Sequence, residues 1–313
     1  MDYISAQDAA TKWGISKRRV QTLCASHRIE NAVRVGNMWI LPGNAEKPSD
    51  GRIKHKKAST HTARKTNPIR VARNQIKTIS TNGMQLLLTE GRSLSEAKIE
   101  IVTIFASELL AHYTQSVDSS LSYDVVCQIT GTVREKSSNA LMIQNSIKEF
   151  ISEHEFFCDD ALSWCYQYIN KLGENAPYSA TQFFTEKYMV STLVDSLQID
   201  PKMKLLDPAC GGGNFLLYCL DVLAEEHLGK AIHSKDMVDG LNSILKNIYG
   251  YEIDPSLAVV ASVNLRLKCV SLLAKHCGHC DIHDFNSFVP QIFFPATDTI
   301  GGALDATFLP QTV

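Results

Sequence analysis

Three consecutive glycines at positions 211–213 constrain the fold of this chain more than any other feature. The apolar pair Leu205-Leu206 and the dipeptide Asp207-Pro208 precede them, and a helix-compatible apolar segment, residues 215–223, follows. This order predicts a β-strand, a glycine loop and the start of a helix. Glycines permit positive φ and let a ligand approach the peptide groups, while a helix N-terminus offers unpaired N–H groups. We therefore expect a ligand site, the alternative being an ordinary tight turn.

The residues around the glycines argue against two common kinds of nucleotide site. A phosphate-binding P-loop needs a Lys-Ser/Thr pair after its last glycine, and Asn214-Phe215 follows here. A dinucleotide site needs the spacing Gly-x-Gly-x-x-Gly, which the run at 211–213 does not have. The loop is expected to serve a different ligand.

The overall composition bounds the class of protein. A length of 313 residues gives room for about two domains with a substantial core. The hydrophobic share of 44% and the charged share of 20% are typical of soluble globular proteins. No apolar run approaches the length of a membrane span and no signal peptide is evident, so we expect no membrane partner. Nine irregularly spaced cysteines predict reduced thiols and a cytoplasmic protein.

Residues 1–45 have the pattern of a small winged helix-turn-helix module. A capping-box-like start at Ser5 predicts a first helix, and Gly14-Ile15-Ser16 separates it from a second helix over 17–26. Two short apolar runs around Gly36-Asn37 predict a β-hairpin in the position of the wing. The segment resembles the DNA-binding domains of excisionases and related regulators.

The resemblance of this module implies binding to double-stranded DNA. Lys17, Arg18 and Arg19 are the candidates for phosphate contacts, and Gln21 or Thr22 for contacts with base edges. The alternative is a small domain that contacts other proteins.

Residues 46–77 are predicted to form a basic flexible linker. Few residues are apolar, and helix-breaking residues such as Pro68 interrupt the segment. Because it follows a predicted DNA-binding module, we interpret its charge as tracking DNA phosphates, although a charge run can also be merely solvated. Its basic residues are Lys47, Arg52, Lys54, Lys56, Lys57, Arg64, Lys65, Arg70, Arg73 and Lys77.

Residues 78–172 are predicted to be helical, because apolar residues recur at helical spacing in two stretches. We find no catalytic motif here and expect a structural or partner-docking bundle. Trp164, Tyr166 and Tyr168 are interpreted as core residues rather than a platform for stacking bases. The two apolar stretches are Ile99, Val102, Phe105, Leu109, Leu110 and Tyr113, then Leu141, Ile143, Ile147, Phe150 and Ile151.

Two further segments flank the glycine loop. Gln182-Phe183-Phe184-Thr185-Glu186 precedes a predicted amphipathic helix whose apolar side is Met189, Val190, Leu193, Val194 and Leu197. Downstream, Ile248-Tyr249-Gly250-Tyr251 predicts a second strand that ends at Glu252, with Asp254 behind it. In a Rossmann-like sheet, the acidic residue that ends this strand accepts hydrogen bonds from ribose hydroxyls.

A third strand is predicted over 279–285, within His279-Cys280-Asp281-Ile282-His283-Asp284-Phe285. Its cysteines and histidines have the chemistry of zinc ligands, but a second pair at zinc-finger spacing is missing, so we predict no metal site.

Together these motifs resemble the DNA adenine-N6 methyltransferases of restriction-modification type over about residues 175–290. Asp-Pro-Ala-Cys-Gly-Gly-Gly-Asn-Phe resembles their S-adenosylmethionine loop, usually Asp-Pro-x-Cys-Gly-Ser/Thr-Gly followed by a small residue and Phe. Ile-Tyr-Gly-Tyr-Glu-Ile-Asp-Pro, followed by Ala258, Ala261, Asn264 and Leu265, resembles the same family. Thr185 matches the threonine of the family's Phe/Tyr-Thr-Pro segment, and Glu186 replaces its proline.

The resemblance implies an α/β fold with a partial Rossmann-like S-adenosylmethionine-dependent methyltransferase domain over 173–313. It implies methyl transfer to the N6 of adenine in DNA. Asp284, or alternatively Asp281, would contact the adenine of the cofactor. The implied cofactor-binding residues are Thr185, Asp207, Pro208, Gly211, Gly213, Glu252 and Asp284.

The family's catalytic motif, Asn/Asp-Pro-Pro-Tyr/Phe, does not occur in this sequence, so no catalytic residue is named. Asn175-Ala176-Pro177-Tyr178 is only superficially similar and precedes the cofactor segments. The chain therefore resembles the N-terminal portion of such an enzyme, which a second polypeptide could complete. The alternative function is a non-catalytic DNA-binding or regulatory protein with a vestigial cofactor fold. Methylation of RNA or protein is disfavoured by the predicted DNA-binding module.

Overall fold

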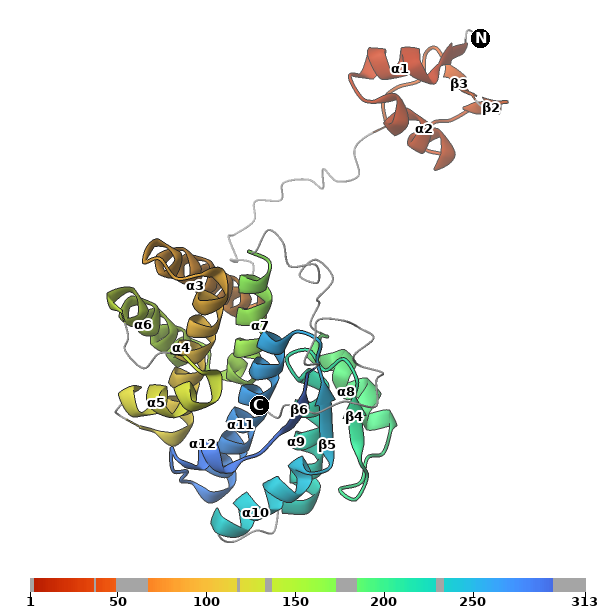
Figure 1. Ribbon diagram of the computed structural model, residues 1–313. Coiled ribbons are helices and arrows are strands. Elements are labelled where there is room, and N and C mark those ends of the chain that lie inside the picture. Colours follow the sequence, from red (N-terminus) through yellow and green to blue (C-terminus); the bar gives the residue numbers. More distant parts are fainter. Residues whose placement is uncertain are drawn as a thin grey trace. The chain divides into compact units, whose positions relative to one another are not determined.

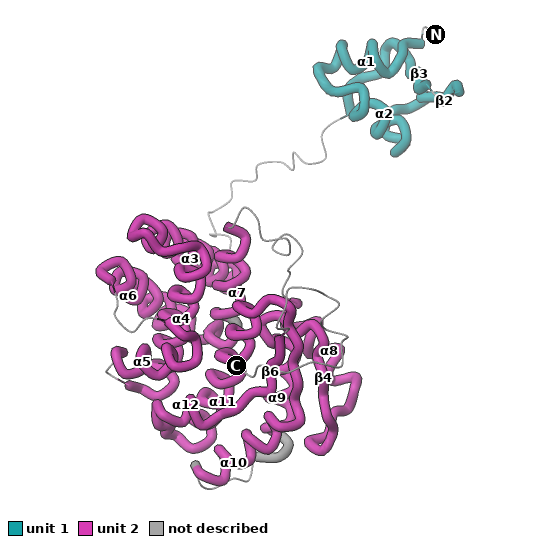
Figure 2. The backbone as a smooth tube through the Cα atoms, viewed as in Figure 1, with its two compact units in different colours: residues 1–65 teal, residues 66–313 magenta. Residues whose placement is uncertain are grey.

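The structure is a computed structural model, and it describes residues 3–36, 38–48, 67–116, 119–132, 137–172, 185–228 and 234–294. Residues 1–65 and residues 66–313 form two compact units (Figure 2). Several predicted features lie outside the described residues: most of the basic stretch, Asn175 to Tyr178, and Gln182 to Phe184.

The described part of the first unit contains two helices and a small antiparallel sheet of order β1-β3-β2 (Figure 1). Ser5 caps the first helix, and its hydroxyl and N–H exchange hydrogen bonds with Asp8, as the capping box predicts. The predicted hairpin is present, and Tyr3–Ser5 adds a third strand that the sequence pattern did not indicate. The elements are β1 Tyr3–Ser5, α1 Ala6–Trp13, α2 Lys17–Ala25, β2 Val33–Val35 and β3 Met38–Pro42.

The second unit begins with a helical region that starts earlier than predicted. We expected a linker up to residue 77, but α3 begins at Pro68 and carries Arg70, Arg73 and Lys77. Proline is compatible with the first turn of a helix because the N–H it lacks has no intrahelical partner there, and the Asn67 side chain caps this helix. The helices are α3 Pro68–Thr89, α4 Leu94–Thr114, α5 Ser119–Thr130, α6 Ser138–Glu153 and α7 Cys158–Asn170, with a 3-10 turn at Glu155–Phe157.

Helix α4 is the centre of the helical region. It is buried almost all round, with charged side chains such as Lys98 and Glu100 buried among its apolar ones, and it packs against α3, α5, α6 and α7. Phe105 on α4 meets Phe150 on α6 edge to face, with ring centroids 5.9 Å apart. Tyr166 is fully buried as predicted, whereas Trp164 and Tyr168 are only half-buried.

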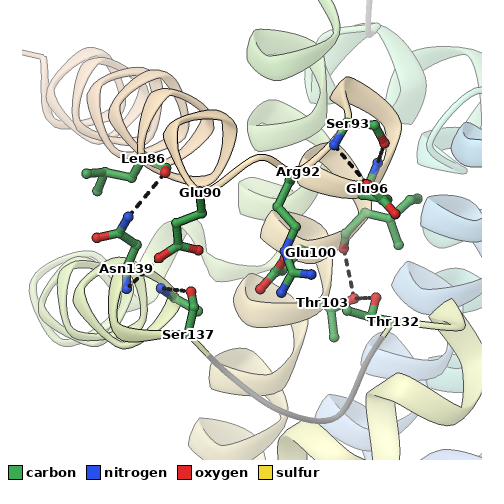
Figure 3. A network of polar contacts seen from close by, with 12 residues as sticks. Leu86, Glu90, Arg92, Ser93, Glu96, Glu100, Thr103, Thr132, Ser137 and Asn139 are labelled. Atoms are coloured by element: carbon green, nitrogen blue, oxygen red, sulfur yellow. Dashed lines mark hydrogen bonds and ion pairs between the residues drawn. The ribbon is translucent and has the colours of Figure 1, made fainter.

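A polar network fixes the junction between α3 and α4 (Figure 3). Ser93 and Glu96 form a capping box at the start of α4. The buried Glu100 carboxylate pairs with Arg92 at 3.0 Å, and burial raises the pKa of Glu100. Further along α4, the Thr103 hydroxyl lies 2.7 Å from that of Thr132, which connects α4 to the segment after α5.

The rest of the second unit is an α/β layer around a parallel sheet of order β4-β5-β6. Helix α11 lies between this sheet and the helical region, because it contacts β6 on one side and α4 and α7 on the other. The elements are α8 Lys187–Ser196, β4 Leu205–Asp207, α9 Asn214–Leu228, α10 Ser234–Leu245, β5 Ile248–Tyr251, α11 Pro255–Cys277, α12 Asp284–Ser287 and β6 Gln291–Phe293.

The third strand does not lie where the sequence pattern predicted it. Residues 279–285 form turns and the start of α12, and β6 at Gln291–Phe293 pairs with β5 instead. Ile292 supplies the buried apolar position of this strand. The polar residues at 281, 283 and 284 favour turns, and Asp281 accepts a hydrogen bond from the His283 N–H at 2.8 Å.

Helix α8 is less buried than its amphipathic pattern predicted. Val190 and Val194 are buried, but Met189, Leu193 and Leu197 are 45%, 54% and 65% exposed. These three side chains, Leu197 at the C-cap of α8, therefore form an apolar face that the described part of the chain does not cover.

Helix α11 is long and apolar enough to cross a membrane by length and composition, although we expected no such run. Within the described residues it is the one helix with this property, and 78% of its most apolar window is buried in the structure. Packing in the core therefore accounts for its composition. All nine cysteines are free thiols, and Cys277 is the one that is not fully buried.

Candidate cofactor site

The glycine loop connects the end of β4 to the start of α9. The Asp207 carboxylate accepts a hydrogen bond from the Ala209 N–H at 3.1 Å, which turns the chain away from the strand. Gly211 and Gly213 have φ values of +55° and +89°, a region that side chains disfavour. The Gly213 N–H donates to the Cys210 carbonyl at 2.8 Å, and α9 begins at the next residue.

Glu252 joins this loop to the end of β5. One carboxylate oxygen accepts a hydrogen bond from the Gly211 N–H at 2.9 Å, and the other accepts one from the Asp254 N–H at 3.0 Å. The residue is only 6% exposed. Burial raises the pKa of Glu252, and the backbone donors at Asp254 and Gly211 oppose that rise. The structure thus brings together two residues that the sequence predicted, Gly211 and Glu252.

Gly250 explains how the loop approaches β5 so closely. A Cβ at this position would lie 2.6 Å from the Ile292 Cδ1, 2.8 Å from the Leu216 Cδ1 and 2.9 Å from the Cys210 sulfur. The Cys210 N–H donates to the Tyr251 carbonyl at 2.9 Å, which continues the strand pairing into the loop. Gly250 was not predicted as a site residue, although a glycine within a strand is a known signal for close approach.

Asp254 has a structural role. Its carboxylate caps α11 by accepting hydrogen bonds from the Ser256 and Leu257 N–H groups at 3.0 and 3.4 Å. The Tyr166 hydroxyl donates to its other oxygen at 3.2 Å. This leaves Glu252 as the candidate for ribose.

Thr185 lies at a different part of the site. Its carbonyl accepts a hydrogen bond from the Asn214 side chain at 3.3 Å, so it is adjacent to the first residue of α9. Thr185 and Asn214 line a cavity that opens to solvent and lies between α3, α4, α7, α8, α9 and α11. Of the predicted cofactor residues, Thr185 is the one that lines it.

Several charged side chains in this cavity form ion pairs. Lys268 donates to the Asp159 and Asp221 carboxylates, both at 2.8 Å. Burial lowers the pKa of Lys268, but the carboxylates of Asp159 and Asp221 together raise it above its usual value. Burial raises the pKa of Asp159, but Lys268, with Lys187 and the Tyr113 hydroxyl, lowers it overall. The charge of Lys268 on the cavity wall is therefore balanced by the neighbouring carboxylates.

Two residues near the loop were not predicted as site residues. Asn264 on α11 donates to the Gly212 carbonyl at 2.8 Å and to the Ser163 hydroxyl at 3.0 Å. The family pattern includes Asn264 but implies no role for it. Ser163 belongs to the helical region and carries no local sequence signal.

Asp284 does not lie near the other predicted cofactor residues. It begins α12, and its carboxylate accepts the Asp281 N–H at 3.0 Å. α12 precedes β6, and the Ser287 carbonyl accepts a hydrogen bond from Asn242 on α10, just before β5 begins. In a parallel sheet this places α12 at the edge where the strands start, opposite to Glu252.

The predicted DNA-binding residues all lie on α2 of the first unit. Lys17 and Arg18 are exposed, Arg19 and Gln21 are half-buried, and the adjacent Val20 belongs to the core.

Comparison with known proteins agrees with this geometry. Residues 158–287 match the family model described as N-6 DNA methylase. The match includes Ser163, the glycine loop, Glu252 and Asn264, and it leaves out the N-terminal unit and α3 to α6. No solved structure matches the chain. The family match supports an adenine-N6 DNA methyltransferase family for this part of the chain, and with it DNA N6 methyltransferase activity in general.

Proposed function

We propose that the chain is the cofactor-binding part of an S-adenosylmethionine-dependent DNA adenine-N6 methyltransferase of a restriction-modification system. The observation that carries the proposal is the buried contact between Glu252 and Gly211. It joins the two segments that resemble the cofactor motifs of the family at the carboxyl end of parallel strands, where α/β sheets bind ligands.

Glu252 is suited to hold the cofactor ribose. A carboxylate has about four lone-pair positions; the N–H groups of Gly211 and Asp254 occupy one on each oxygen, and the Ile253 N–H also donates to this carboxylate. The remaining positions can accept hydrogen bonds from ribose hydroxyls. When bound, S-adenosylmethionine supplies an activated methyl group on a positively charged sulfonium centre, and the Asp207 carboxylate at the end of β4 would be a candidate to complement that charge. Thr185 would lie toward the methionine end.

The first unit and the basic segment after it would bind double-stranded DNA. Lys17, Arg18 and Arg19 are proposed to contact phosphates, and Gln21 is proposed to contact base edges. A module of this kind would bring the methyltransferase domain to DNA and add a salt-dependent affinity.

A second polypeptide is proposed to complete the methyltransferase domain. β4 is an edge strand of the described sheet, and Leu206 on it is 66% exposed. The apolar face of α8 lies close by in sequence. An open strand edge with exposed apolar side chains favours pairing with another segment.

The alternative function is a DNA-binding regulator with a vestigial cofactor fold. The observation in its favour is that the sequence contains no Asn/Asp-Pro-Pro-Tyr/Phe motif. The two functions differ in cofactor binding, because a regulator with a vestigial cofactor fold need not bind S-adenosylmethionine.

The proposal is tested by calorimetry with S-adenosylmethionine on the wild-type chain and on Glu252→Ala. We expect wild-type binding and a loss of about 1–3 kcal/mol in the variant, because charge-assisted hydrogen bonds are removed. Glu225→Ala, at an exposed acidic residue on α9, is the matched control and should bind as the wild type does. Unchanged affinity in a folded Glu252→Ala protein would contradict the assignment of Glu252 to the cofactor site. Absence of binding by the wild type would favour the alternative function, a DNA-binding regulator.

A further inference from the structure

A series of hydrogen-bonded, mostly buried side chains connects the helical region to two segments of the proposed cofactor site, the glycine loop and the segment around Thr185. Ser163 on α7 is 2% exposed and Asn264 on α11 is 5% exposed. Asn264 donates to Ser163 and to the carbonyl of Gly212 within the glycine loop. Ser163 in turn donates to the Asn214 side-chain oxygen at 3.2 Å. The position of the loop is therefore coupled to α7.

The same series of hydrogen bonds continues to the segment around Thr185. The Asn214 amide donates to the Thr185 carbonyl, so a continuous series of hydrogen bonds connects Gly212 to Thr185. Buried polar networks whose members are all satisfied restrict the groups they connect to one arrangement. Ser163 is the member that belongs to the helical region.

A second, independent contact holds the Thr185 segment from α3. The Arg73 guanidinium forms two parallel hydrogen bonds to the Glu186 carboxylate, at 2.9 and 2.5 Å. It also lies 3.9 Å from the ring centre of Trp164 on α7, in cation–π geometry. The bonds from Arg73 lower the pKa of Glu186.

Glu186 is also the position at which this chain departs from the Phe/Tyr-Thr-Pro pattern. A proline would restrict the backbone of the preceding threonine. Here the residue after Thr185 is instead fixed by an ion pair with a helix residue 113 positions away. A bidentate Arg–carboxylate pair defines orientation as well as distance.

We propose that Arg73 and Ser163 are positioning residues of the cofactor site. The helical region would then hold the glycine loop and the Thr185 segment in the arrangement that binds the cofactor. The proposal rests on the proposed binding of S-adenosylmethionine. It also changes the role of Arg73, which the sequence placed in a DNA-tracking linker. Neither residue is proposed to touch the cofactor: Arg73 acts through Glu186, and Ser163 acts through Asn264 and Asn214.

Charge-reversal variants distinguish a positioning role of Arg73 from a general effect of its substitution on folding. Arg73→Glu and Glu186→Arg should each weaken S-adenosylmethionine binding by about tenfold, which equals about 1.4 kcal/mol. The double variant should recover most of the lost affinity, because the ion pair forms again with reversed charges. Arg70→Glu is the matched control, since Arg70 is exposed on the same helix, and its affinity should equal that of the wild type.

Hydrogen exchange gives a readout that does not need the cofactor. The amides of Met189 and Val190 donate to the Glu186 carbonyl, so they should exchange faster in Arg73→Glu and recover in the double variant. For Ser163, Ser163→Ala should weaken binding severalfold. Ser107→Ala is its control, because Ser107 is equally buried and donates to the Ile104 carbonyl of its own helix.

The outcomes separate the positioning inference from the proposed function. If the wild-type chain binds the cofactor and Arg73→Glu and Ser163→Ala bind it equally well, the positioning inference is overturned while the proposed function stands. The inference is also overturned if exchange at α8 changes and affinity does not. If the wild type does not bind, the proposed function fails and the inference fails with it.

Discussion

The Glu252 carboxylate accepts a hydrogen bond at 2.9 Å from the N–H of Gly211, a residue 41 positions earlier in the chain. The contact is buried, and it connects the end of one parallel strand to the loop that follows its neighbour. Because the same carboxylate also accepts the Asp254 N–H, it fixes the loop and the strand end together.

Glu252→Gln should therefore lower the free energy of unfolding by about 1–2 kcal/mol, because the amide keeps one acceptor oxygen and leaves one buried N–H without its partner. Denaturation in urea measures this. Glu225→Gln at an exposed position should change stability by less than about 0.5 kcal/mol. Equal stability of wild type and Glu252→Gln would mean that the carboxylate does not hold the loop.

Gly250→Ala should destabilise the protein by about 1–3 kcal/mol, because its Cβ would overpack against Ile292, Leu216 and Cys210. Thermal unfolding gives the comparison. Gly83→Ala on α3 is the comparison, since its Cβ would meet only side-chain atoms, the nearest at 3.3 Å, which is a smaller overlap than at Gly250, and alanine favours helix. Similar melting temperatures for the two variants would contradict the close approach of loop and strand.

The buried Glu100 predicts a pH dependence of stability (Figure 3). Its pKa is raised by burial, so the folded state holds the proton more tightly than the unfolded state does. The contribution of Glu100 is most favourable below the unfolded pKa of about 4.3 and declines as pH rises through the folded pKa. The free energy of unfolding of the wild type, minus that of Glu100→Gln, should fall over this range. A constant or rising difference would contradict the raised pKa.

The exposed face of α8 should contribute little to the stability of the chain by itself. Leu193→Ala should change the free energy of unfolding by less than about 0.5 kcal/mol, whereas the buried Val194→Ala should cost about 1–2 kcal/mol. Urea denaturation of both variants provides the comparison. A large loss in Leu193→Ala would show that another part of the chain covers this face.

The first unit should bind DNA through the exposed side of α2. Replacing Lys17 and Arg18 with alanine should weaken DNA binding. The plot of log affinity against log salt concentration should become less steep, its negative slope decreasing in magnitude by about 2. Fluorescence anisotropy at several salt concentrations measures both quantities. An unchanged slope would favour the alternative in which this unit contacts proteins.

Local signals in the sequence predicted the parts of the site that depend on neighbouring residues. Ser5 with Asp8 specifies a helix start, and the glycines at 211 and 213 specify a turn at positive φ. Glu252 follows a short apolar strand, but its prediction as a site residue also depended on the glycine loop upstream and on the family resemblance. The helix start and the turn are each decided within a few positions of the chain.

Other features depend on contacts between distant residues and could not be predicted in this way. Arg73 meets Glu186 across 113 positions, and Asn264 meets Ser163 across 101 positions. The boundary at Pro68 differs from the prediction because proline acts here as a first-turn residue rather than as a helix breaker. The third strand lies later than predicted because the Cys-Asp-Ile-His-Asp run has strand-like alternation but forms turns.

The most direct test of the proposed cofactor site is amide hydrogen exchange of the full chain with and without S-adenosylmethionine. We predict slower exchange on cofactor addition in residues 208–213, at the end of β5 near Glu252, and at the start of α8. Residues 1–45 and α12 should not change. Absence of protection in the glycine loop, or protection confined to α12, would contradict this site.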